Sequence, residues 1–166
     1  MNKKKVVLVM QHDETDCAAA CLSSIAKFYG KRVSINKIRF FAGTDWMGTS
    51  GLGIVKGAGA LGLSCRGMLS QNRELCEDAV FPLICHVKND VIDHYVVVYG
   101  LSRNKVVVAD PADGIKKVPL EEFRKTWTGV FFVVVPKQNF QRTKETCGIF
   151  QRFLYLLKPY KKTVAE

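Results

Sequence analysis

The chain has 166 residues and a formal net charge of +10, with 48% hydrophobic and 24% charged residues. This composition is typical of a globular protein and excludes collagen-like or largely disordered chains. The length is sufficient for one domain with its own core, and no apolar run approaches the length of a membrane span. The first lysines and the apolar residues 6–10 resemble a signal peptide, but the stretch is too short, so the sequence predicts a cytosolic chain.

The positive charge is concentrated at the two ends of the chain. Residues 6–136 carry a net charge of +2, whereas residues 1–5 carry +3 and residues 137–166 carry +5. A nucleic-acid site needs lysines and arginines clustered on the folded body, so we expect no nucleic-acid partner. Basic ends fit a position beside the cytosolic face of a membrane, and they fit solvated tails equally well.

The six cysteines do not form a pattern typical of disulfides or zinc. No CxxC pair occurs, and a chain of this size without a secretory signal is expected to keep free thiols. No two ligand residues show a structural zinc spacing, so we expect no metal. Most cysteines are therefore predicted to be small buried hydrophobes. They are Cys17, Cys21, Cys65, Cys76, Cys85 and Cys147.

The first part of the chain has the periodicity of helices. Residues 6–10 could form an edge strand. Capping residues and glycines then delimit three helices. These are residues 17–29 after Asp13 or Asp16 and before Gly30, residues 35–42 between Ser34 and Gly43, and a helix from Ser50 to near Gly62.

The pattern then changes to β-branched runs separated by turns. An antiparallel sheet that follows helices predicts an α+β domain rather than a doubly wound one. The expected strands are 63–69, 81–87, 92–101, 105–109 and 129–135, with a helical turn near 72–77 and a short helix from Pro119 to about Trp127.

The C-terminal segment differs in composition from the rest. We divide the chain into a domain of residues 1–136 and a segment of residues 137–166. Residues 137–146 are polar and predict a linker. Residues 147–159 carry apolar side chains at helical spacing, which predicts an amphipathic helix. Such a helix could lie at a membrane interface, pack on a neighbouring domain or dock on its own domain.

One glycine pattern argues against a nucleotide site. Gly57, Gly59 and Gly62 match GxGxxG, but here a helix precedes the motif and a strand follows it, which reverses the dinucleotide-binding context. We therefore interpret these glycines as sites of close helix packing and as a helix stop.

Cys17 has the position of an activated nucleophile. It lies at the start of a predicted helix, where free N–H groups and the helix dipole stabilise a thiolate and could bind an oxyanion. Cys21 lies one turn deeper on the core face, so its role is predicted to be structural. A cysteine near a helix start is nevertheless often inert.

His94 and Asp110 are predicted neighbours. A hairpin that turns at residues 102–104 brings them together within a residue or two of register. A strand histidine is often only a core residue, and an aspartate before proline often only begins a turn. Together, however, the order Cys, His, Asp is that of a papain-type site.

Three ordered motifs resemble one peptidase family. Gln11 followed by Asp16-Cys17-Ala18, then the run from His94 to Gly100, then Ala109-Asp110-Pro111 are similar to the bacteriocin-processing, or double-glycine, cysteine peptidases. These are N-terminal cytosolic domains of peptidase-containing ABC transporters. The resemblance covers about residues 6–136 and implies a papain-like fold.

The resemblance also implies roles for individual residues. Cys17 would be the nucleophile, His94 the general base and acid, and Asp110 the group that orients the imidazole. Gln11 matches the glutamine that helps to form the oxyanion hole. The expected substrate is a precursor with an amphipathic helical leader that ends in Gly-Gly. Trp46 and Met47 are candidates for the leader surface, although ordinary core contacts are the alternative.

The same resemblance implies the wider setting. The partners would be the transmembrane and nucleotide-binding domains of the same transporter, at the cytoplasmic face of the membrane. No cofactor is expected in this domain, and ATP would bind only in the nucleotide-binding domain. Two alternatives remain open, namely a non-catalytic domain that only docks leader peptides and another papain-like chemistry such as acyl transfer.

Overall fold

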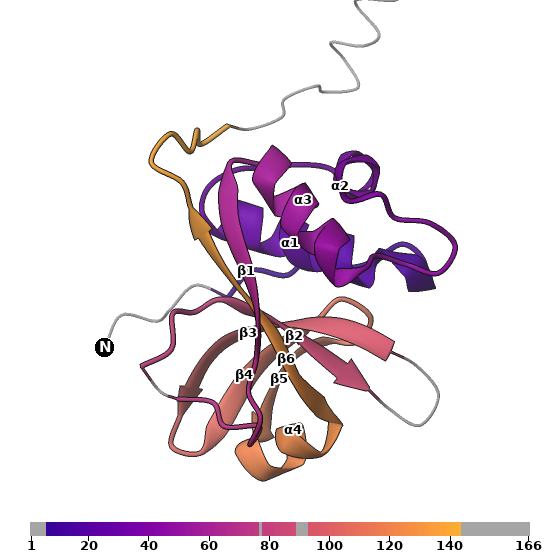
Figure 1. The fold of residues 1–166 in the computed structure, drawn as a ribbon. Coiled ribbons are helices and arrows are strands. Elements are labelled where there is room, and N and C mark those ends of the chain that lie inside the picture. The colour runs from indigo at the N-terminus through magenta and orange to yellow at the C-terminus, as the bar shows by residue number, and fades with distance from the viewer. Residues whose placement is uncertain (1–5, 77, 89–92, 144–166) are drawn as a thin grey trace, which may run out of the picture.

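The computed structural model describes residues 6–76, 78–88 and 93–143, which form a group of helices and a six-stranded antiparallel sheet (Figure 1). The sheet has the strand order β1-β6-β2-β3-β4-β5. The elements are α1 (Cys17–Phe28), α2 (Ile35–Ala42), α3 (Gly51–Ala60), β1 (Leu63–Leu69), β2 (Leu83–Lys88), β3 (Asp93–Ser102), β4 (Lys105–Asp110), β5 (Gly114–Pro119), α4 (Leu120–Thr126) and β6 (Trp127–Pro136), with a 3-10 turn η1 (Glu14–Asp16) before α1. The predicted α+β class is confirmed.

Figure 1 shows α1, α2 and α3 gathered on one side of the sheet, and α4 at its opposite end. We call these two parts the helical lobe (residues 14–60) and the sheet lobe (residues 63–136). The three predicted helices are confirmed. The capping signals explain their ends, since Ser50 Oγ accepts a hydrogen bond from Gly53 N at 3.1 Å and Gly43 ends α2 with φ 65°.

The GxGxxG segment packs helices, as predicted, but not through all of its glycines. A Cβ on Gly57 would lie 3.1 Å from Leu22 and 3.2 Å from Ala42, so this glycine permits close packing of the helical lobe. A Cβ on Gly59 would meet nothing within 4 Å. Gly62 adopts φ +82°, which ends the helix before β1.

The sheet buries apolar side chains on both faces. One face packs on the helical lobe with residues such as Val97, Ala109 and Phe132. The other face packs on α4 around Trp127, which is fully buried and stacks on Phe123. Because both faces of the sheet are covered, the strand sequences are nearly continuous runs of apolar residues and do not alternate strictly between apolar and polar residues.

Two predictions about local structure were wrong. Residues 6–10 are not a strand, because their polar groups bond to side chains and loops rather than to a ladder: Val9 N donates to Ser24 Oγ and Tyr99 Oη donates to Val7 O. Residues 72–76 form no helix. Arg73 has φ 52°, which is not a helical value. The backbone of Glu74 forms its hydrogen bonds with the Ser70 hydroxyl instead of with the backbone of a helix.

The sequence analysis also missed β5. This strand is short, largely exposed and contains two lysines, as is typical of a sheet edge that must not pair with other chains. It therefore lacks the apolar run by which the other strands were found.

The segment after β6 follows the helical lobe as far as the structure describes it. Lys137 N donates to Gly62 O at 3.1 Å, and Arg32 N donates to Thr143 O at 2.9 Å. Phe140 meets the ring of Tyr29 edge-on. The predicted amphipathic helix of residues 147–159 lies outside the described residues, and the proposed division at residue 136 stays a prediction.

Candidate active site

The first part of the site is at the N-terminus of α1. The 3-10 turn η1 leads directly into Cys17, the first residue of the helix, and Asp13 accepts a hydrogen bond from Thr15 N that begins this turn. The side chains of Ala18, Ala19 and Ala20 are fully buried, so α1 packs closely against β3. Cys17 itself is 7% exposed. The free N–H groups of a helix start therefore surround a sulfur atom that is nearly covered.

The second part of the site is the hairpin of β3 and β4. Its turn is Arg103–Asn104, and both residues have positive φ, as a two-residue hairpin turn of type I′ requires. His94 Nε2 lies 2.7 Å from Asp110 Oδ1. The predicted neighbour pair is therefore present, at the end of the hairpin away from its turn.

A β-bulge decides that the two side chains share a face of the sheet. Near the turn Ser102 pairs with Lys105, and this register would place Asp110 opposite Val97, whose side chain faces the helices. The ladder shifts by one residue at Tyr99, so that Val97 instead pairs with Ala109. If the shifted register is continued for one more residue, the side chain of Asp110 lies on the same face of the sheet as the side chain of His94.

The imidazole of His94 lies between Asp110 and Cys17. Its Nε2 bonds Asp110, and the side chain of Cys17 is near enough to act on the ring. Burial would lower the pKa of His94, but the interactions with Asp110 and Cys17 outweigh burial and raise this pKa to about 9. His94 is therefore protonated at neutral pH.

Asp110 is held as a carboxylate. Burial would raise its pKa, but the hydrogen bonds from His94 and from the backbone N–H of Ala112 lower it. The Ala112 bond to Asp110 Oδ1 measures 2.8 Å and fixes the carboxylate at the end of β4. A fixed carboxylate orients the imidazole and selects which ring nitrogen carries the proton toward it.

Gln11 joins the site through the loop that follows β4. Its backbone N–H donates to the carbonyl oxygen of Pro111 at 3.0 Å, so the segment before α1 is bound to the residue after Asp110. Its side-chain Oε1 is buried and has no hydrogen-bond partner among the described residues. The four predicted residues Gln11, Cys17, His94 and Asp110 thus come from three distant segments and meet between the two lobes.

A cavity of about 590 Å³ opens beside the His94–Asp110 pair. Gln11, Glu14, His94 and Asp110 contribute polar groups to its wall, and its apolar lining comes from α4 and from the face of the sheet that α4 covers. That lining is Val87, Val96, Val108, Val118 and Phe123. The pair is therefore reachable from solvent, whereas the sulfur of Cys17 is not part of this cavity wall.

The remaining cysteines of the described residues lack such surroundings. All five described cysteines are free thiols. Burial raises the pKa of Cys21 and Cys85, and it raises that of Cys65 to about 11. Within the described part of the chain, no three metal-ligating side chains are grouped as a metal site needs. No helix there has the length and apolarity to cross a bilayer.

The model of one family, described as the peptidase C39 family, matches residues 5–139. The chain belongs to the peptidase C39 family. The match covers the helical lobe, the whole sheet and all four residues of the site. This agrees with the papain-like arrangement, in which a cysteine at a helix start meets a histidine carried by a sheet.

Curated relatives of this C39 member include two transport proteins from Lactococcus lactis. The lactococcin-G-processing and transport ATP-binding protein LagD is 35% identical over 152 residues, which is 90% of this chain and 22% of the relative. The lactococcin transport/processing ATP-binding protein LcnC-like is 37% identical over 169 residues, or 99% of this chain and 24% of the relative. The chain thus spans about a quarter or less of the length of these relatives.

Two solved structures share the fold. The peptidase domain of Streptococcus ComA, a bi-functional ABC transporter, has a TM-score of 0.74 and 35% identity, and the match covers 80% of this chain and all of that domain. A double glycine motif protease solved in complex with the leader peptide has a TM-score of 0.74 and 30% identity, over 81% of this chain and 94% of that one.

Sequence reasoning missed one part of the site. Arg39 of α2 contacts Asp16, the residue directly before Cys17. No local signal could have identified this contact, because it joins residues 23 positions apart on two different elements.

Proposed function

We propose that this chain is a cysteine endopeptidase domain that removes the leader of a secreted peptide precursor by cutting after a Gly-Gly pair, in concert with an ABC transporter. The observation that carries the proposal is the position of His94, which bonds Asp110 and is near enough to Cys17 for the cysteine to raise the pKa of the imidazole. This is the arrangement that a cysteine nucleophile needs, and the chain belongs to a peptidase family.

The first half of the reaction forms a thioester. The Cys17 thiolate attacks the carbonyl carbon of the second glycine, and the carbonyl oxygen becomes an oxyanion. The N–H groups at the start of α1 and the side-chain amide of Gln11 stabilise this oxyanion. The His94 imidazolium then donates its proton to the departing amine, so that the core peptide leaves with a neutral N-terminus.

The second half hydrolyses the thioester. His94, now neutral, takes a proton from water as the water oxygen attacks the thioester carbon. The carbon–sulfur bond breaks, the leader leaves with a C-terminal carboxylic acid that releases its proton to solvent, and Cys17 returns to the thiolate beside protonated His94. Asp110 holds the imidazole in one orientation through both halves and does not itself take up the proton.

The Gly-Gly specificity would follow from a narrow approach to Cys17. Cys17 is nearly covered, at 7% exposed, and a substrate residue without a side chain reaches a covered cysteine most easily. A glycine at each of the two positions before the cut also leaves the substrate backbone free to adopt an unusual conformation.

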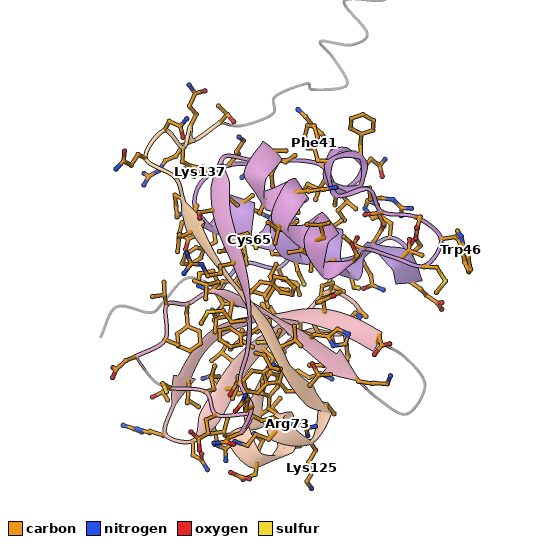
Figure 2. The ribbon with its side chains drawn as sticks, in the orientation of Figure 1. Phe41, Trp46, Cys65, Arg73, Lys125 and Lys137 are labelled. Atoms are coloured by element: carbon orange, nitrogen blue, oxygen red, sulfur yellow. The ribbon has the colours of Figure 1, made fainter. Side chains whose placement is uncertain are left out.

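The leader would bind at a separate apolar surface on the helical lobe. Trp46 projects from the loop between α2 and α3 at the edge of the molecule, and its exposed fraction is 84% (Figure 2). Met47 is 74% exposed beside it, so neither residue makes the ordinary core contacts that were the alternative. We assign this pair to contact with the apolar face of an amphipathic leader helix.

The proposed setting is the cytoplasmic face of a membrane. The basic ends of the sequence, residues 1–5 and 137–166, carry most of its excess positive charge, which fits a position beside such a face. The partners would be transmembrane and nucleotide-binding domains, with ATP bound only in the latter and no cofactor in the peptidase domain. The names of the relatives, which are transport ATP-binding proteins, support this setting.

The test is a cleavage assay with a synthetic leader–core peptide that contains Gly-Gly, followed by mass spectrometry. We expect one cut after the second glycine with the unchanged chain. We expect no cut with Cys17→Ala, although this variant still binds the leader, and none with a peptide in which Gly-Gly is replaced by Ala-Ala. Saturable binding without a cut by the unchanged chain would contradict the proposal and favour a docking domain.

A further inference from the structure

The carboxylate of Asp16 lies in the turn between Gln11 and Cys17. Asp16 directly precedes the proposed nucleophile, and its side chain is only 2% exposed. Its Oδ2 accepts a hydrogen bond from the backbone N–H of His12 at 3.3 Å, and His12 is the residue after Gln11. The carboxylate therefore connects the beginning of the turn to its end and fixes the path of the backbone between the two site residues.

This arrangement places a negative charge on the residue directly before the cysteine that is proposed to react as a thiolate. A like charge nearby disfavours ionisation of a thiol, and the effect is strongest where water is excluded. Asp16 would therefore oppose the chemistry of Cys17 if its charge were not balanced. A buried carboxylate without a partner would also destabilise the fold.

Arg39 of α2 balances that charge. Its Nη1 contacts Asp16 Oδ1 and lies 3.0 Å from Asp13 Oδ2 and 3.1 Å from Thr15 Oγ1. One guanidinium thus binds two carboxylates and one hydroxyl, all in the turn that leads into α1. The side chain of Arg39 is 29% exposed and reaches the turn from outside.

We propose that Asp16 and Arg39 form a charge-balanced clamp that positions the peptidase site, in which Asp16 holds the turn from Gln11 to Cys17 and Arg39 cancels its charge so that Cys17 ionises readily. Both are positioning residues, because neither belongs to the group of atoms that would react. The inference rests on the proposed function, since it names the supports of the same site.

The other groups that face Cys17 do not replace Arg39. His94, bonded to Asp110, supplies a positive charge from the sheet lobe. Burial raises the pKa of both Tyr95 and Cys21, so these two neighbours are uncharged at neutral pH. Among the described residues, Arg39 is the cation that contacts Asp16, so Arg39 balances this carboxylate.

The test measures alkylation of Cys17 by iodoacetamide as a function of pH, read from the Cys17 peptide by mass spectrometry. Asp16→Asn keeps an acceptor for His12 N and leaves Arg39 bonded to Asp13, so we expect it to fold and to shift the midpoint of alkylation to lower pH. Arg39→Met leaves the charge of Asp16 unbalanced, so we expect a shift to higher pH by about one unit.

Two further variants make the result specific. The double variant Asp16→Asn/Arg39→Met removes both charges, so its midpoint should return close to that of the unchanged chain. Arg124→Met is the matched control, because Arg124 pairs with Glu121 on α4 and has a similar exposed fraction of 32%, but lies in the other lobe. It should leave the midpoint unchanged.

The outcomes separate a charge effect from a loss of structure. Shifts of opposite sign for the two single variants support the clamp, since general loosening would not give them. The clamp would be overturned if the alkylation midpoints of the two single variants shift in the same direction. It would also be overturned if the midpoint of Asp16→Asn does not shift, or if the midpoint of the double variant stays displaced from that of the unchanged chain. If Arg39→Met does not fold, Asp16→Asn decides alone. Alkylation reports on Cys17 whether or not the chain cuts peptides, so failure of the clamp and failure of the peptidase are distinct results.

Discussion

The helical lobe and the sheet lobe contribute to the site in different ways. The helical lobe encloses its residue: Cys17 is nearly covered, and the turn before it is held by the Asp16–Arg39 ion pair. The sheet lobe leaves its residues open, since the side chains of His94 and Asp110 are 17% and 26% exposed beside a cavity. In the proposed reaction, the helical lobe would fix where the carbonyl group of the substrate lies, and the sheet lobe would hold the proton.

This difference predicts different pH behaviour for the two lobes. The protonated imidazole of His94 is lost as the pH rises through its folded pKa of about 9, so the sheet lobe sets the alkaline limb of activity. Variants of the sheet lobe that change the surroundings of His94 should therefore move this limb, whereas variants of the helical lobe should leave it in place.

The largest effect is expected for loss of the proton carrier. His94→Ala should lower kcat/KM for leader cleavage by about 10³-fold or more, because neither the thiolate nor the leaving amine then has a proton partner. His86→Ala is the matched control. His86 lies on the neighbouring strand β2 and bonds Thr128 Oγ1 at 3.1 Å rather than Cys17. Its replacement should therefore lower kcat/KM only a few-fold. Equal losses in both variants would contradict the assignment.

The second effect tests the proposed oxyanion donor in the segment before α1. Gln11→Ala should lower kcat by about 10²- to 10³-fold with little change in leader binding, as the loss of one oxyanion donor does elsewhere. Gln11→Glu keeps the size and the backbone bond to Pro111 but replaces the amide donor with a carboxylate, so it should be no more active. Full activity in Gln11→Glu would show that this side chain does not bind the oxyanion.

The third effect tests the sheet side through pH. Asp110→Asn removes the carboxylate that raises the pKa of His94, while burial continues to lower it. We expect about a 10²-fold loss of kcat/KM at neutral pH, and we expect the alkaline limb to move to lower pH by about one unit or more. The measurement is kcat/KM across the alkaline range. An alkaline limb that stays at the same pH in this variant would mean that Asp110 does not control the imidazole.

The smallest effect concerns the close packing of α3 against α2 in the helical lobe. A Cβ on Gly53 would lie 2.5 Å from the backbone oxygen of Ala42, so Gly53→Ala should reduce the free energy of unfolding by about 1–3 kcal/mol. Gly59→Ala in the same helix meets no atom within 4 Å and should increase it by about 0.5–1 kcal/mol. Urea denaturation of both variants measures the two free energies of unfolding. A lower free energy of unfolding in both variants would indicate that close packing is not the reason for these glycines.

Much of the local structure was determined by the sequence alone. Capping residues and glycines delimit α1, α2 and α3, and the change to β-branched runs marks the sheet. The arithmetic of the hairpin predicts that His94 lies beside Asp110. The errors fall where local signals are weak. Residues 6–10 have β-branched side chains but bond to side chains and loops, and β5 is an exposed edge with lysines.

Three features of the site were decided only by the tertiary structure. The bulge at Tyr99 brings Asp110 to the face of His94, packing of α1 on β3 brings Cys17 to the imidazole, and Arg39 reaches Asp16 from another helix. Sequence spacing specifies neighbours along a strand, a turn or a helix, because there the backbone geometry is repetitive. Contacts between lobes depend on how two apolar surfaces fit together, and residue spacing does not encode that fit.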